Sequence, residues 1–161
     1  MAIYNLEFQT WINVPPRTAY EHLSDPHNLV GLQPLLTYVD AVQTGEENGL
    51  RSVSYETVEA FRWMNIVLYR NRIRVQAVFT DPPRQINMVV HSFPKIVLNV
   101  EYTFTPQENG VLVRETMQIH THALLARFVT SEATKAQTAL LENLKDRLEK
   151  IQPKLANISI S

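Results

Sequence analysis

One acidic residue, Glu115, lies inside an otherwise apolar pattern, and its position suggests chemistry more directly than any other in the chain. It alternates with Val111, Val113, Met117 and Ile119. Alternate residues of a β-strand point to the same face, so we expect Glu115 to lie on a buried face. A buried carboxylate is costly unless it is paired or hydrogen bonded. Either a protein partner such as an arginine or Tyr102 satisfies it, or it is a polar anchor or general acid/base for a bound molecule. Glu59 and Asn71 raise the same question more weakly.

Other polar residues also recur at a spacing of two. His120 and His122 share one predicted strand face and resemble half of a metal site. Metal coordination needs three or four converging ligands, and no further ligand follows from the spacing, so we predict no metal. Arg70, Arg72 and Arg74 oppose an apolar phase and are typical of a solvated outer face. Contact with an anionic headgroup or a partner is the alternative.

Composition bounds the class of protein. The chain has 161 residues, 45% of them apolar, a formal net charge of −1 and no cysteine. These values predict one domain over residues 1–152 with a tail over 153–161. They also argue against a nucleic-acid footprint, a disulfide framework and a thiolate metal site. We see no signal peptide and no apolar run of the ~20 residues that a membrane span needs. We therefore expect a cytoplasmic protein with no cofactor.

The predicted elements are mostly strands. Leu124–Ile151 repeats apolar residues at steps of three and four and predicts a long amphipathic helix. After the first strand, Pro16 opens a short helix and a second short one covers about Pro26–Gly31. The seven predicted strands are Tyr4–Val14, Leu36–Thr44, Leu50–Ala60, Tyr69–Thr80, Gln85–His91, Ile96–Thr105 and Val111–Thr121. We predict an α+β fold in which a curved antiparallel sheet wraps around the long C-terminal helix.

The joints between strands differ in character at the two ends of the sheet. Three of them are polar and rich in turn formers, at 45–49, 81–84 and 106–110. Because alternate connections of a meander fall at the same end, the apolar joints share the opposite end. Its predicted entrance residues are Trp63, Met64, Phe93, Leu124 and Leu125. The segment 61–68 is a lid, a membrane-docking tip, a dimer contact, or simply a continuation of two longer strands.

The order of elements resembles the START-like superfamily, also called SRPBCC, with its helix-grip fold and its polyketide cyclase members. The residues that carry the resemblance are Ile12–Tyr20, which is similar to the strand-to-helix entry of that superfamily, Leu23–Leu29, and Leu140–Glu149. The likeness extends from about Tyr4 to Lys150. It implies a deep apolar cavity between sheet and long helix, used in that superfamily for lipids, sterols and polyketides. Its motifs mark a fold and not a reaction.

Such a cavity would be lined by the buried phases of the strands and by one stripe of the helix. Most of these residues are equally well explained as core. The predicted lining residues are Tyr55, Ile73, Val75, Leu98, Val100, Tyr102, Glu115, Met117, Val129 and Ala133.

Three functions remain open from the sequence. The leading hypothesis is a non-catalytic carrier or sensor of a small hydrophobic molecule, because of the START-like resemblance and the apolar end. No phosphate loop, nucleophile elbow or zinc-protease helix emerges from the sequence. The second is a polyketide aromatase/cyclase-like enzyme in which Glu115, Tyr55 or Tyr102 moves protons. The third is a partner-binding module that uses Trp63 and Phe93. We expect a monomer or a homodimer, with transient membrane contact as an option.

Overall fold

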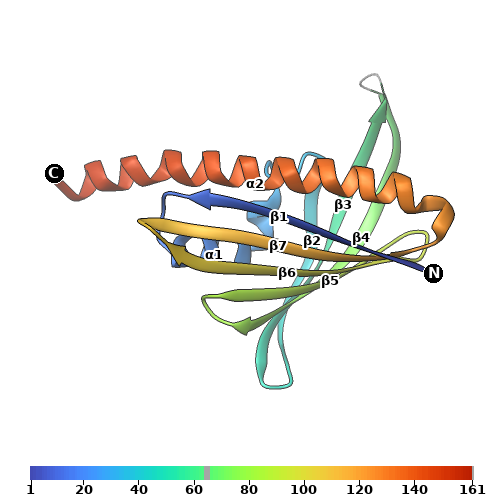
Figure 1. Ribbon diagram of the computed structural model, residues 1–161, viewed down its shortest axis with the longest axis horizontal. Coiled ribbons are helices and arrows are strands. Elements are labelled where there is room, and N and C mark those ends of the chain that lie inside the picture. The colour runs from blue at the N-terminus through green and yellow to red at the C-terminus, as the bar shows by residue number, and fades with distance from the viewer. Residues whose placement is uncertain (64–65, 161) are drawn as a thin grey trace.

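The computed structural model describes the backbone of residues 1–63 and 66–160, and the side chains of residues 1–60, 66 and 70–151. Within these residues, seven strands form one antiparallel sheet in the order β1-β7-β6-β5-β4-β3-β2. A long helix, α2, lies across the concave side of the sheet (Figure 1). The strands are β1 (Ala2–Ile12), β2 (Leu36–Glu47), β3 (Leu50–Trp63), β4 (Ile66–Asp81), β5 (Gln85–Ser92), β6 (Ile96–Gln107) and β7 (Gly110–Thr121), and the helices are α1 (Pro16–Ser24), the 3-10 helix η1 (Pro26–Leu29) and α2 (Ala123–Ile160). The α+β helix-grip prediction is confirmed.

The inner face of the sheet follows the predicted alternation. Every second residue of β7 from Val111 to Thr121 is buried, and Glu115 is one of them. On β4 the arginines Arg70, Arg72 and Arg74 are exposed, as expected for the outer face. Arg72 forms ion pairs there with Glu56 on β3 and Asp40 on β2. The sheet therefore has one apolar face for the helix and one solvated face.

Several strand ends differ from the predicted limits. β1 ends at Ile12 instead of Val14, because the Val14 amide turns back to donate to the Ile12 carbonyl at 2.9 Å before the two prolines. β3 reaches Trp63 and β4 begins at Ile66, so the apolar joint is mainly strand, with a register shift between Phe61 and Arg62. Of the interpretations given to this joint, continued strand is correct for its backbone on both sides of residues 64–65, which lie outside the described residues.

The helix α2 packs on the sheet through the middle of its predicted stripe. Ala136, Leu140, Leu144 and Leu148 are buried, whereas Ile151 is 41% exposed. The predicted end at Ile151 is wrong, because α2 continues through Pro153 to Ile160. Residues 153–160 are therefore helical. A proline removes one helical hydrogen bond, but here it does not end the helix. Figure 1 shows this end of α2 projecting beyond the sheet.

The short helix α1 covers one end of the sheet. Tyr20 on α1 packs edge-on against Phe104 of β6, with ring centroids 5.5 Å apart, and against Phe79 of β4 at 6.2 Å. Both phenylalanines lie close in sequence to the polar turns 81–84 and 106–110. These aromatic contacts pack α1 against the sheet at the polar end.

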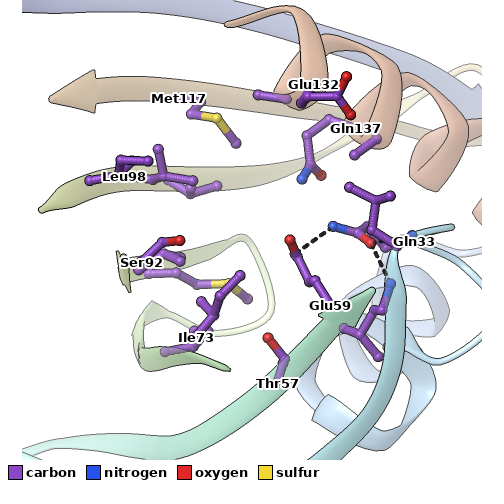
Figure 2. A pocket seen from close by; sticks show the side chains of 18 of the residues that line it. Gln33, Thr57, Glu59, Ile73, Ser92, Leu98, Met117, Glu132 and Gln137 are labelled. Carbon is purple, nitrogen blue, oxygen red and sulfur yellow. Dashed lines mark hydrogen bonds between the residues drawn. The ribbon is translucent and has the colours of Figure 1, made fainter. Parts of the chain in front are cut away.

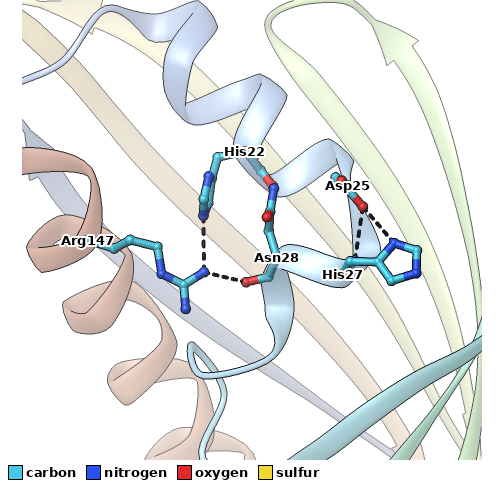
Figure 3. Close-up of polar contacts among 5 residues, drawn as sticks. All are labelled: His22, Asp25, His27, Asn28 and Arg147. Atoms are coloured by element: carbon cyan, nitrogen blue, oxygen red, sulfur yellow. Dashed lines mark hydrogen bonds and ion pairs between the residues drawn. The ribbon is translucent and has the colours of Figure 1, made fainter. Parts of the chain in front are cut away.

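Arg147 of α2 holds the segment around η1 against the long helix (Figure 3). Its Nη1 donates to the carbonyl of Asn28 at 2.7 Å and faces Nε2 of His22 at 3.2 Å, and its Nη2 donates to the carbonyl of Val30 at 3.0 Å. Burial and then the charge of Arg147 lower the pKa of His22, which keeps the imidazole neutral at pH 7. Gly31, at φ +85°, leaves room for the guanidinium, since a Cβ there would lie 3.0 Å from Nη2.

We expect Arg147→Met to lower the free energy of unfolding by about 2 kcal/mol, because it removes charged donors from two carbonyls while keeping the side-chain stem. Urea denaturation of the purified variant measures the change. Lys150→Met is the matched control, since Lys150 is exposed on the same helix. Equal losses in the two variants would show that the contacts of Arg147 carry no stability.

Candidate functional site

A cavity of about 650 Å³ lies between the inner face of the sheet and α2. Strands β3 to β7 supply most of its wall, α2 covers it, and residues around η1 close one side. The ten residues predicted to line a cavity all lie along its wall: Tyr55, Ile73, Val75, Leu98, Val100, Tyr102, Glu115, Met117, Val129 and Ala133. The alternation in the strands brings them together because one phase of each strand faces the helix.

Only some of the predicted entrance residues line the cavity. Phe93, in the β5–β6 turn, lines the cavity and is 70% exposed, and Leu125 in the first turn of α2 also lines it. Leu124 is 88% exposed and is not part of the wall. The side chain of Trp63 and all of Met64 lie outside the described residues. Phe93 and Leu125 thus mark one open edge of the cavity, away from α1.

Glu115 lies in the wall with no exposed surface. It stands opposite Tyr102 of β6 and Phe8 of β1 in the sheet. Neither of its carboxyl oxygens has a hydrogen-bond partner of standard geometry among the described residues. The predicted arginine partner is therefore not found there, and Tyr102 acts on the carboxyl without completing a regular bond. Glu115 is therefore a buried carboxyl whose only described polar neighbour is Tyr102, and neither oxygen has a regular hydrogen bond among the described residues.

Glu115, Tyr102 and Tyr55 form one corner of the cavity wall, and burial keeps all three side chains mainly uncharged. Burial raises the pKa of Glu115 to about 8, and the Tyr102 hydroxyl lowers it by a smaller amount. Burial also raises the pKa of Tyr102 and of Tyr55 above the usual tyrosine value. At neutral pH the carboxyl is mostly protonated and both phenols are neutral. This corner offers hydrogen-bonding groups without a fixed charge.

A second cluster of polar side chains lies on the cavity wall, and the sequence did not predict that they come together. Gln33, in the loop after η1, donates to Glu59 of β3 at 2.9 Å, and its side-chain oxygen accepts from the amides of Leu35 and Leu36 at 2.9 and 2.8 Å (Figure 2). Burial raises the pKa of Glu59, and the bond from Gln33 opposes that rise. Gln137 of α2 points toward this pair, and its Oε1 is buried without a partner among the described side chains (Figure 2).

Three further polar residues flagged or missed by the sequence lie nearby on the wall. Asn71 of β4 donates to the Ser92 hydroxyl of β5 at 2.6 Å, and Thr57 of β3 also lines the cavity. The signal that would have found Gln137 is its place in the stripe of α2, four residues after Ala133. No pattern in the sequence predicts that Gln33 lies on the wall, because its loop has no hydrophobic periodicity.

His120, near the end of β7, and His122, just after that strand, each contact other residues. His120 Nε2 lies 2.8 Å from Gln118 and 3.3 Å from Asn99, and His122 Nδ1 accepts from the Leu124 amide at the start of α2 at 3.2 Å. Among the described residues, no three histidines or carboxylates are gathered as a metal site would require. In the same part of the chain, no helix is long and apolar enough to cross a membrane.

The sequence profile of one protein family, described as "Polyketide cyclase / dehydrase and lipid transport", matches residues 5–149. The chain belongs to this family. The match covers nearly all of the sheet, the two short helices and most of α2, which together enclose the cavity of this chain. No curated protein is a significant match.

Several solved structures share this fold, and one of them is described as a START superfamily protein. The chain is similar to the Zhui aromatase/cyclase from Streptomyces sp. R1128, with a TM-score of 0.73, 14% identity and coverage of 92% of this chain and 95% of that one. It is also similar to a START superfamily protein from Mycobacterium smegmatis, with a TM-score of 0.71, 11% identity and coverage of 91% and 98%. A third is the protein TTHA0849 from Thermus thermophilus, with a TM-score of 0.69, 17% identity and coverage of 89% and 96%. At these identities the likeness shows the fold alone.

Proposed function

We propose that this protein binds a small hydrophobic molecule of the lipid, isoprenoid or polyketide class in the cavity under α2. The observation that carries the proposal is the cavity itself, about 650 Å³ with a mainly apolar wall, which is within the usual size of ligand sites. Polar residues are a minority of the wall and include the Glu115–Tyr102, Gln33–Glu59 and Asn71–Ser92 pairs, as expected for groups that orient a bound molecule. The family description, which names both polyketide chemistry and lipid transport, supports the same class of ligand.

Fluorescence titration with the neutral dye Nile red tests this proposal. We expect saturable binding of one dye per chain with a blue-shifted emission, since the dye moves from water to an apolar site. Farnesol, a monoacylglycerol and a hydroxyanthraquinone then compete for the site, and at least one of them displaces the dye. A dye signal that rises without saturation, and that no competitor reduces, would contradict the proposal.

A polyketide aromatase/cyclase-like enzyme is the second candidate, favoured by the contact between Glu115 and Tyr102. A protonated carboxyl with a pKa of about 8, beside a phenol, suits general acid/base work on a folded poly-β-ketone. Glu115→Gln and Tyr102→Phe are then expected to lower kcat for cyclisation at least 100-fold. The exposed Glu142→Gln on α2 is the control. Full turnover by both cavity variants would exclude this role.

A further inference from the structure

The cavity wall is acidic. Three glutamates line it, Glu59, Glu115 and Glu132, and no lysine, arginine or histidine is found among the described lining residues. An anionic ligand, such as a fatty acid, would bury its charge beside carboxyl groups and without a counter-charge, which costs free energy. The lining thus disfavours anions and favours neutral or cationic molecules.

The three glutamates differ in whether they already have partners. Glu132 lies 3.7 Å from the ammonium group of Lys135, and Glu59 accepts the bond from Gln33. Glu115 is fully buried, and both its oxygens lack a regular hydrogen bond among the described residues. A buried polar group is normally satisfied by protein or solvent, so Glu115 is the carboxyl left for a ligand. Oε1 of Gln137 adds a third acceptor oxygen without a regular hydrogen bond to the described part of the wall.

We infer that the ligand is a hydrophobic amine whose protonated nitrogen pairs with the Glu115 carboxylate while its apolar body fills the cavity. This inference rests on the proposed function and names the ligand class of the same site. An ammonium group supplies three hydrogen-bond donors to carboxyl oxygens that have no regular hydrogen bond among the described residues. Tyr55 and Tyr102 line the same corner, and their rings add the aromatic surroundings that bound cations favour.

Binding of an amine is linked to release of a proton. In the empty cavity burial keeps Glu115 protonated, and the arriving positive charge favours its ionised form. Among the described residues, the other titratable groups on the wall are Tyr102 of β6, Tyr55 and Glu59 of β3, and Glu132 of α2. One proton leaves for each amine bound below about pH 8. The affinity for the amine therefore rises about tenfold per pH unit up to that value and levels off above it.

Three probes of equal chain length test the inference: dodecylamine, dodecan-1-ol and dodecanoic acid, each competing with Nile red below its micelle concentration. At pH 7.5 we expect the amine to bind at least tenfold more tightly than the alcohol, and the acid to bind most weakly. Between pH 6.5 and 7.5 only the amine gains affinity, by about tenfold. Calorimetry in phosphate and Tris buffers reports close to one proton released per amine and none per alcohol at pH 6.5.

Glu115→Gln assigns the effect to one residue. This variant keeps the shape of the side chain and is expected to lose the preference for amine over alcohol, together with the proton release. Glu142→Gln, exposed on α2, keeps both. Should Glu115→Gln fold poorly, the pH dependence and proton release of the unmodified protein still decide the matter. Equal binding of all three probes without pH dependence overturns the amine inference and leaves hydrophobic binding standing, whereas no binding by any probe overturns both.

Discussion

Glu115→Gln is expected to be several kcal/mol more stable than the unmodified protein at pH 9 and nearly equal to it at pH 5. In the folded protein the pKa of Glu115 is about 8, whereas the ordinary value for glutamate is 4.5. Between these values the folded state binds more protons than the unfolded state, so the free energy of unfolding falls as pH rises. Above about pH 8 both states are ionised and the loss is complete.

The size of this effect follows from the shift. A pKa difference of one unit corresponds to about 1.4 kcal/mol, so a shift of this size amounts to at most roughly 5 kcal/mol. Glutamine does not titrate, and the variant therefore keeps at high pH the stability that the glutamate loses. Glu59 also has a raised pKa, so a smaller slope of the same sign remains in the variant.

Urea denaturation of the ligand-free proteins at pH 5, 7 and 9 measures the effect. The exposed Glu142→Gln variant is the matched control and is expected to follow the unmodified protein at every pH. If Glu115→Gln instead ran parallel to the unmodified protein across this range, Glu115 would be ionised in the folded state and would have a partner that the geometry does not reveal.

Ala133→Trp is expected to weaken binding of Nile red and its competitors at least tenfold. Ala133 lies on α2 and lines the cavity, so an indole at this position occupies the volume that the ligand needs. The helix keeps its buried contacts through Leu140, Leu144 and Leu148, and we therefore expect the fold to survive. Far-UV circular dichroism checks the fold, and dye titration checks binding.

Thr138→Trp provides the control for this substitution. Thr138 is exposed on α2 and is not part of the cavity wall, so the same new side chain there leaves the volume open. Binding that survives Ala133→Trp in full would mean that the dye sits outside the cavity. Loss of binding in both variants would point to a general effect on the helix.

The part of the site formed by the strands was predictable, because strand geometry fixes direction. Once β7 is recognised, the alternation puts Glu115 on the same face as Val113 and Met117, and pairing with β6 then brings Tyr102 opposite to it. The helix stripe identified Ala133 and Val129 in the same way. Local periodicity is enough here, since each residue reaches the cavity through its position in a regular element.

The polar group around Gln33 was not predictable, because it depends on how distant segments meet. Gln33 lies in an irregular loop, and only the folded chain brings it to Glu59, 26 residues later. Gln137 was not predicted for a different reason. A glutamine next to the apolar stripe of a helix is as consistent with the edge of the solvent-exposed face as with a cavity wall. The end of α2 was missed because the predicted helix followed the apolar repeat, which stops at Ile151, whereas the observed helix continues to Ile160.

Native mass spectrometry tests most directly whether the cavity holds a hydrophobic molecule. The unmodified protein and Ala133→Trp are each equilibrated with a total lipid extract, freed of excess and sprayed from a volatile buffer. We predict a 1:1 complex of the unmodified chain with a small molecule that denaturation releases, and bare chain for Ala133→Trp. Bare chain in both samples would contradict the assignment of this protein as a binder of hydrophobic ligands.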